Sequence, residues 1–179
     1  MKKKVLVIST SLRANSNSDA LAQEFARGAK EAGNDVEYLT LRDKAIGFCK
    51  GCLACQKTGV CVIKDDANVI AEKMLHADVL VYATPIYYYE MAGQMKTLLD
   101  RMNPLYGSDY AFREIYLLST AADTEETTPK RALDGLGGWI DCFEKAGLAG
   151  SLFCGGVNGA GEIGGNEKLK EAFEMGKNC

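Results

Sequence analysis

Residues 4–25, KVLVISTSLRANSNSDALAQEF, decide the fold of this chain. An apolar run from Val5 to Ser9 is followed by a loop of hydroxyl and amide side chains and then by a segment with helical periodicity. Such a run is typical of a strand that is buried on both faces. The following helix would direct its free N–H groups and the positive end of its dipole at the loop, as phosphate sites do. The alternative is a loop that only caps its helix, since Ser and Asn are common caps.

The first loop offers donors for one phosphate group. It lacks the glycine patterns of dinucleotide-binding and triphosphate-binding loops, which favours a ligand with a single phosphate. Hydroxyl, amide and guanidinium groups could donate to the phosphate oxygens. The candidate donors are Ser11, Arg13, Ser16, Asn17 and Ser18.

Strands and helices alternate along the rest of the chain. The later strands are predicted at residues 35–41, 78–84, 114–120 and 150–154, and the helices at 16–32, 66–76, 91–102, 129–146 and 167–175. This alternation indicates one α/β domain over residues 1–179, with a parallel sheet covered by helices on both faces. We expect a flavodoxin-like, doubly wound sheet of five strands in the order 2-1-3-4-5. Ligands of such sheets bind beyond the carboxyl ends of the strands.

Composition and charge exclude several classes of protein. Hydrophobic residues make up 47% of the chain and charged residues 25%, which is typical of a globular protein. The net charge of −3 provides no basic surface for nucleic acid, and no apolar run is long enough to span a membrane. Seven cysteines, an odd number, favour metal or redox chemistry over a disulfide framework. We therefore expect a cytoplasmic protein.

Aromatic residues follow the predicted strand 78–84. The sequence Pro85-Ile86-Tyr87-Tyr88-Tyr89 lies at the ligand-binding edge of the predicted sheet. Tyrosines in this place could cover a planar apolar ligand while their hydroxyl groups remain in water. Exposed tyrosines are also typical of dimer interfaces, and the two interpretations are compatible.

Three motifs together carry a family resemblance. They are Thr10-Ser11-Leu12-Arg13-x-x-x-Asn17-Ser18, Pro85-Ile86-Tyr87 and Lys96-x-x-x-Asp100-Arg101. The first two thirds of the chain, which hold these motifs, resemble the NAD(P)H-dependent FMN reductase family of flavodoxin-like oxidoreductases. The chain departs from the family in having Thr10 where members commonly have Gly. The resemblance implies that Ser11, Arg13, Asn17 and Ser18 hold the FMN phosphate and that the flavin ring contacts Pro85, Ile86, Tyr87, Tyr88, Thr120, Ala121 and Ala122.

The resemblance also implies an activity. Electrons would pass from NAD(P)H through FMN to a small acceptor such as a quinone, a flavin, a nitroaromatic or a metal ion, in a homodimer or homotetramer. No catalytic side chain is expected, because the flavin carries the chemistry. A single histidine, His76, leaves Ser-His-Asp and zinc-hydrolase sites incomplete. The sequence does not fix the acceptor or the choice between NADH and NADPH.

The cysteine motif indicates a second redox group. Cys49, Cys52, Cys55 and Cys61 form C-x2-C-x2-C-x5-C, and such short spacings let thiolates bind one cubane cluster. The spacing resembles that of iron–sulfur flavoproteins, in which a [4Fe–4S] cluster lies near FMN. This implies an alternative function as an electron carrier between protein partners. Free thiols or a reversible disulfide remain the other interpretation, because cluster-free flavin reductases carry a similar pattern followed by an Asp pair, here Asp65-Asp66. The Asp pair precedes a predicted helix, which favours an N-cap over a pair of acid/base carboxylates.

Overall fold

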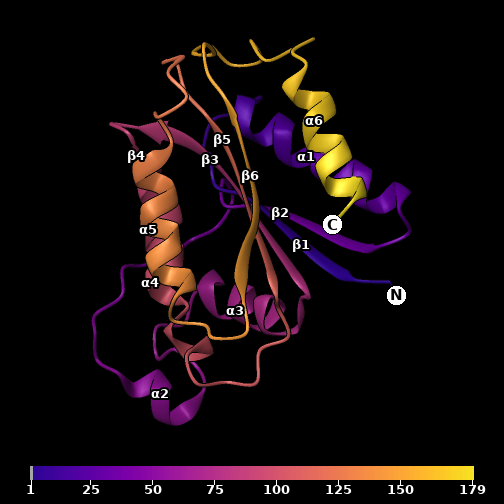
Figure 1. Ribbon diagram of the computed structural model, residues 1–179. Coiled ribbons are helices and arrows are strands. Elements are labelled where there is room, and N and C mark those ends of the chain that lie inside the picture. The colour runs from indigo at the N-terminus through magenta and orange to yellow at the C-terminus, as the bar shows by residue number, and fades with distance from the viewer. Residues whose placement is uncertain (1) are drawn as a thin grey trace.

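A parallel sheet of five strands lies at the centre of the computed structural model, which describes residues 2–179 (Figure 1). Its strands are β1 (Lys4–Ser9), β2 (Asp35–Thr40), β3 (Val79–Tyr87), β5 (Glu114–Thr120) and β6 (Gly147–Cys154). The order β2-β1-β3-β5-β6 is the predicted order 2-1-3-4-5 of the parallel strands, so the flavodoxin-like fold is confirmed. A short sixth strand, β4 (Glu90–Met91), pairs antiparallel with the end of β3 and was not predicted.

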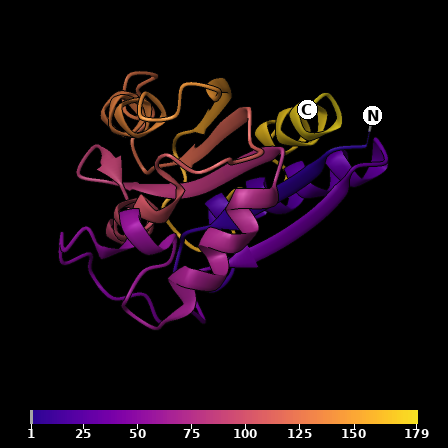
Figure 2. The same ribbon diagram turned by 90° about the horizontal axis from the view of Figure 1, so that it is seen from below.

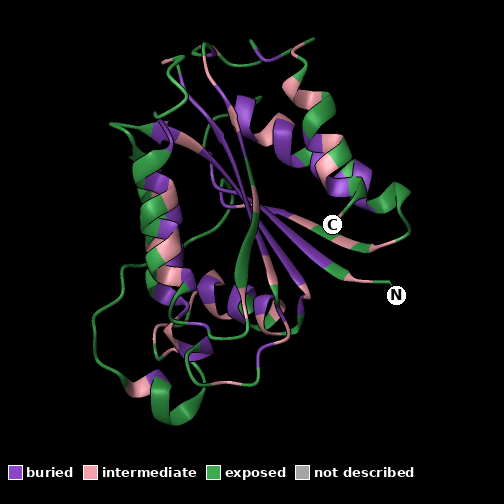
Figure 3. Cartoon of the chain, in the orientation of Figure 1, coloured by how far each residue is buried: buried purple, intermediate pink, exposed green. Residues whose placement is uncertain are grey.

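Helices cover both faces of the sheet. One face packs against α1 (Asn17–Glu31) and α6 (Lys168–Lys177), and the other against α3 (Asp66–His76), α4 (Gly93–Arg101) and α5 (Lys130–Ile140). Figure 3 shows that the central strands β1, β3 and β5 and the inner helix faces are buried, whereas the edge strands β2 and β6 are partly exposed and the segment between β2 and α3 is largely exposed. That segment holds the short helix α2 (Ala54–Thr58) and lies on the opposite side of the molecule from α6 (Figure 2). None of the helices within residues 2–179 has the length and hydrophobicity needed to cross a membrane.

Two glycines allow α1 and α6 to pack closely. A Cβ atom added at Gly28 would lie 1.9 Å from the carbonyl oxygen of Phe173, and one at Gly176 would lie 2.0 Å from that of Phe25. Only glycine fits at such a backbone approach. The contact fixes α6, and with it the end of the loop that connects β6 to α6.

Some element boundaries differ from the sequence prediction. Helix α5 ends at Ile140, whereas the apolar pattern predicted a helix to Ala146. Turn hydrogen bonds from Phe143 N to Ile140 O and from Ala146 N to Phe143 O replace the last helical turns and bury Phe143 in the core. Strand β6 begins at Gly147, three residues before the predicted start at residue 150. The prediction missed this start because glycine is unfavourable in strands.

Candidate functional site

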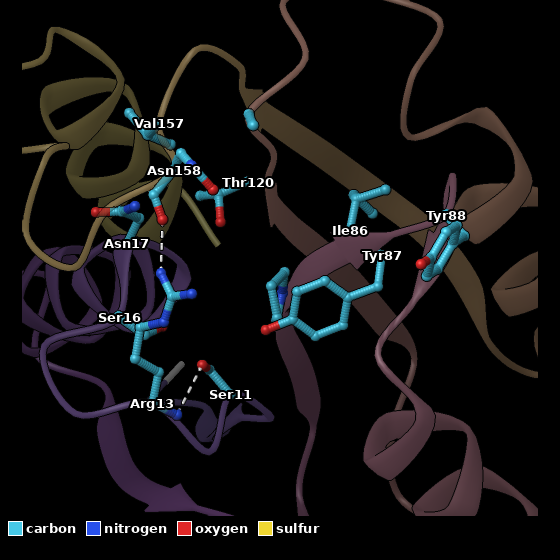
Figure 4. Close-up of a pocket in the computed structure, with 12 residues that line it drawn as sticks. Ser11, Arg13, Ser16, Asn17, Ile86, Tyr87, Tyr88, Thr120, Val157 and Asn158 are labelled. Atoms are coloured by element: carbon cyan, nitrogen blue, oxygen red, sulfur yellow. Dashed lines mark hydrogen bonds between the residues drawn. The ribbon is translucent and has the colours of Figure 1, made fainter.

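A pocket lies at the carboxyl ends of the central strands, where the predicted sheet would bind a ligand (Figure 4). Its volume is about 300 Å³, which is within the range of small-molecule sites. Four loops supply its lining, which comprises Ser11, Arg13, Ser16, Asn17, Pro85, Ile86, Tyr87, Tyr88, Thr120, Ala122, Val157 and Asn158. All the predicted cofactor-binding residues except Ser18 and Ala121 are thus brought together, although their roles in binding stay predictions.

One end of the pocket carries buried hydroxyl groups at the start of α1. Ser16 is the N-cap of α1, and its Oγ accepts a hydrogen bond of 3.2 Å from the Asp19 N–H. Ser18 lies behind Ser16, with 3.0 Å between the two hydroxyl oxygens. Ser11 Oγ accepts a bond of 3.2 Å from the Arg13 N–H. Capping by Ser16 is therefore confirmed, and the buried hydroxyls and the positive end of the helix dipole also provide an environment that suits an anion.

The side chains of Arg13 and Asn17 reach the glycine-rich loop, which we define as residues 155–165. Arg13 Nη1 donates to the Asn158 carbonyl oxygen at 2.6 Å, a contact drawn in Figure 4. Asn17 Nδ2 donates to the Gly159 carbonyl oxygen at 2.9 Å, and Asn17 Oδ1 accepts from Ile163 N at 3.2 Å. These partners are more than a hundred residues apart in sequence. The sequence motifs assigned no site residue to this loop.

Two carboxylates near the pocket remain ionised. Backbone N–H groups of Asn158 and Gly159, and then the charge of Arg13, lower the pKa of Glu162. The backbone N–H of Glu125 and further hydrogen bonds lower the pKa of Asp123. Glu162 thus places a negative charge near Arg13, whereas Asp123 lies near Tyr89 of the hairpin turn.

The other end of the pocket is aromatic. β3 and β4 form a hairpin in which Ile86 pairs with Met91 and Tyr87 with Glu90. The two residues of its turn, Tyr88 and Tyr89, have φ angles of 51° and 66°, in the left-handed region that a type I′ turn requires. The turn holds Tyr88 almost fully exposed at the rim, whereas the ring of Tyr87 points into the pocket (Figure 4).

The four motif cysteines line a second hollow of about 400 Å³. Asn103 Nδ2 donates to Cys55 Sγ at 3.1 Å, and Gly51 N donates to Cys49 Sγ at 3.4 Å. The donor set therefore suits a thiolate-bound cluster, because N–H groups directed at sulfur stabilise ligating thiolates. In the described part of the chain, however, no three His, Cys, Asp or Glu side chains converge as metal ligands do. All seven cysteines are free thiols in the structure.

A buried arginine holds both ends of the cysteine segment, which we define as residues 47–65. The Arg101 guanidinium, on α4, forms a two-pronged ion pair with Asp65 at 2.6 and 2.9 Å. It also donates to the carbonyl oxygens of Gly47 at 2.8 Å and Ile63 at 3.1 Å. Asp65 in turn caps α3 by accepting from Ala67 N, as predicted. Burial alone would raise the pKa of Asp65, but the hydrogen bonds from Arg101, Gly47 and Ala67 lower it below its ordinary value.

Comparison with known proteins identifies the class. The chain belongs to the NADPH-dependent FMN reductase family, which it matches over residues 3–128. This range holds the first loop, the tyrosine hairpin, the cysteine segment and Arg101.

Individual relatives are similar to the chain in sequence, and one solved structure is similar to it in fold. The chain is 37% identical over 102 residues to an iron-sulfur flavoprotein of Methanocaldococcus jannaschii, in a match that covers 57% of this chain and 53% of that protein. It is 33% identical over 110 residues to an iron-sulfur flavoprotein of Methanosarcina thermophila, covering 62% and 58%. The chain thus spans little more than half the length of these curated relatives. The NAD(P)H:quinone oxidoreductase of Methanothermobacter marburgensis has the same fold, with a TM-score of 0.74, 17% identity and coverage of 99% and 96%.

Proposed function

We propose that the protein is an FMN-dependent NAD(P)H oxidoreductase that reduces a small acceptor, such as a quinone, a flavin, a nitroaromatic or a metal ion. The observation that carries this proposal is the pocket, with its buried hydroxyl groups and a guanidinium at one end and its aromatic turn at the other. This distribution of polar and apolar groups suits a ligand with a phosphate and a planar ring system. Membership of the NADPH-dependent FMN reductase family supports the same ligand.

Each end of the pocket has a distinct task in this proposal. Ser11, Arg13 and Ser16, which line this end of the pocket, would bind the phosphate through two buried hydroxyl groups and the guanidinium, and Ser18 would support Ser16 from behind. The flavin ring would be oriented by residues of the β3–β4 hairpin and of the loop after β5, namely Pro85, Ile86, Tyr87, Tyr88, Thr120, Ala121 and Ala122. FMN, when bound, supplies the hydride and electron transfer. The chain's own residues bind the cofactor, exclude water from its buried face and leave the other side open to nicotinamide and acceptor.

Assembly and location are further parts of the proposal. Tyr87, Tyr88 and Tyr89 expose large aromatic surfaces at the pocket rim. Aromatic residues are enriched at protein interfaces, which supports a homodimer or homotetramer with subunits in contact here. The seven free thiols suit a reducing compartment such as the cytoplasm.

The cysteine segment favours a second candidate function, as an electron carrier between protein partners. In this function Cys49, Cys52, Cys55 and Cys61 would hold a [4Fe–4S] cluster, although their hollow shares no lining residue with the flavin pocket and the expected position beside FMN is not seen within one chain. The shared hollow and the N–H groups directed at two of the sulfur atoms support it, as do the names of the two archaeal relatives. The sulfur atoms would have to move together to reach a cluster, since they do not converge in the described residues.

Anaerobic purification separates the two candidates. The oxidoreductase should carry FMN, show a flavin spectrum that NAD(P)H bleaches, and reduce a quinone in repeated turnovers. The carrier should in addition contain iron and sulfide in multiples of four per chain and lack steady-state turnover with small acceptors. Protein that stays colourless and shows no thermal shift with excess FMN would contradict both.

A variant of the phosphate-binding end tests the pocket itself. Arg13→Met should weaken FMN more than riboflavin, because riboflavin lacks the phosphate that the guanidinium would bind. The matched control is Arg27→Met, which removes a guanidinium from an exposed ion pair with Glu24 on α1. The control should leave both affinities unchanged. Equal binding of FMN by wild type and Arg13→Met would contradict the assignment of this end to the phosphate.

A further inference from the structure

We propose that Asn17 is a positioning residue that holds the glycine-rich loop as a wall of the flavin pocket, and that this tether, and not a contact with the phosphate, is its main contribution to flavin binding. The inference rests on the proposed binding of FMN in this pocket. It assigns to Asn17 a role different from the one that the sequence motif suggests, and it makes the glycine-rich loop part of the binding site.

The base of the glycine-rich loop is fixed by the neighbouring loop after β5. Val157 N donates to the Ala121 carbonyl oxygen at 2.9 Å, and Gly156 N donates to that of Asp123 at 3.3 Å. A Cβ atom at Gly155 would lie 2.5 Å from the Asp123 carbonyl oxygen, so this approach requires glycine. These hydrogen bonds hold Val157 in the pocket wall and do not involve α1.

The rest of the loop depends on side chains of the first loop and α1. Asn158 is exposed, and the chain returns to the core at Ile163, which is 2% exposed. Between these two points the contacts with the first loop and α1 are the Arg13 bond to Asn158 and the two Asn17 bonds to Gly159 and Ile163. Asn17 is itself 6% exposed, so its amide bonds are shielded from competing water.

The amide of Asn17 is engaged by the loop at both of its polar atoms. Its nitrogen donates to one loop carbonyl and its oxygen accepts from one loop N–H, so the side chain bridges Gly159 and Ile163. Donation to a phosphate would use only the N–H groups of the amide and would leave Oδ1 without a partner, whereas here Oδ1 accepts from Ile163 N. The pairing of both atoms therefore points to a tether that keeps Asn158 beside Arg13 and Thr120 in the lining (Figure 4).

The two roles predict different responses to two ligands. A tether shapes the wall that every flavin meets, so its loss should weaken FMN and riboflavin by the same factor. A phosphate ligand contacts only FMN, so its loss should weaken FMN alone. The ratio of the two dissociation constants therefore separates the roles.

The test compares Asn17→Ala with Asn34→Ala in the full chain. Asn34 is a matched control, because its amide also bonds at both ends, to Lys3 N and Cys179 Sγ, but lies before β2 at the opposite edge of the sheet. Dissociation constants for FMN and riboflavin are measured by fluorescence quenching. Hydrogen–deuterium exchange measures how fast the backbone N–H groups of the glycine-rich loop exchange with solvent. Asn17→Ser, which keeps a hydroxyl group at the start of α1, serves if Asn17→Ala is too unstable to purify.

We expect Asn17→Ala to weaken both flavins about tenfold and to accelerate exchange at Ile163, while Asn34→Ala changes neither. Weakening of FMN alone, or an unchanged exchange rate at Ile163, would overturn the inference. Wild-type protein that binds neither flavin would refute the proposed function itself and the inference with it. Wild-type binding combined with selective loss of FMN would refute only the inference.

Discussion

Replacing Arg101 with methionine should destabilise the protein by about 3 to 5 kcal/mol, because it removes one partner of a buried ion pair. The Arg101 side chain is 0% exposed and that of Asp65 is 12% exposed. Methionine fills a similar apolar volume, so the main loss is electrostatic. The Asp65 carboxylate would keep its hydrogen bonds from Gly47 N and Ala67 N but lose both bonds from the guanidinium.

The surroundings of the Arg101–Asp65 ion pair determine where the destabilisation falls between about 3 and 5 kcal/mol. The 12% exposure of Asp65 allows some hydration of the stranded carboxylate, which lowers the cost. The Gly47 residue is exposed as well, so its freed carbonyl oxygen can bond to water. We therefore expect a value near the lower limit, about 3 kcal/mol. The double variant Asp65→Asn with Arg101→Met should be less destabilised than the sum of the single variants, by about 2 kcal/mol.

The assay is equilibrium unfolding in urea, with Lys96→Met as the matched control. Lys96 lies on the same helix and forms an ion pair with Asp100 in which both side chains are about half exposed. Such exposed pairs contribute little, so the control should change the free energy of unfolding by less than about 0.5 kcal/mol. A loss below about 1 kcal/mol for Arg101→Met, or strict additivity in the double variant, would refute the argument that this ion pair holds the cysteine segment.

Three further predictions concern other parts of the fold. Because the pKa of Asp65 is lowered in the folded state, its ionised carboxylate stabilises the fold above the ordinary pKa near 4, and this stabilisation is lost as the pH falls through the folded-state pKa. In urea unfolding at a series of acid pH values, the free energy of unfolding should therefore fall more steeply for wild type than for Asp65→Asn. Gly28→Ala should cost about 3 kcal/mol in the same assay, since its Cβ would lie 1.9 Å from the Phe173 carbonyl oxygen, and a neutral result would mean that α1 and α6 can separate freely. Tyr88→Asn, at a φ of 51°, should raise the melting temperature by about 2 to 4 °C, because Asn tolerates the left-handed region better than Tyr; a lower melting temperature would show that the tyrosine ring contributes packing.

The sequence was sufficient to predict the sheet order and most of the pocket. Apolar runs such as Val79–Ala83 can hardly be other than buried strands, and alternation with helices leaves few topologies. The ligand-binding edge follows from the topology, which explains why Ser11, Tyr87 and Thr120 were correctly grouped. Local patterns also predicted the caps at Ser16 and Asp65.

The features that the sequence did not predict depend on distant contacts or on strain. Nothing near Asn17 in sequence indicates that its amide bonds to Gly159 and Ile163, because that pairing depends on the packing of α6 against α1. The hairpin at Tyr88 and Tyr89 lacks the usual Asn or Gly turn residues, so β4 was missed. Glycines likewise concealed the start of β6 at Gly147.

The Arg101 contacts hold the two ends of the cysteine segment close together. One guanidinium binds Gly47, Ile63 and Asp65, so the chain leaves and re-enters the domain at neighbouring positions. Doubling the length of a flexible segment between fixed ends costs only about 0.6 kcal/mol in closure entropy. We therefore expect that segments of different length and cysteine spacing can be grafted between these anchors without changing the sheet or the pocket at the carboxyl ends of its strands.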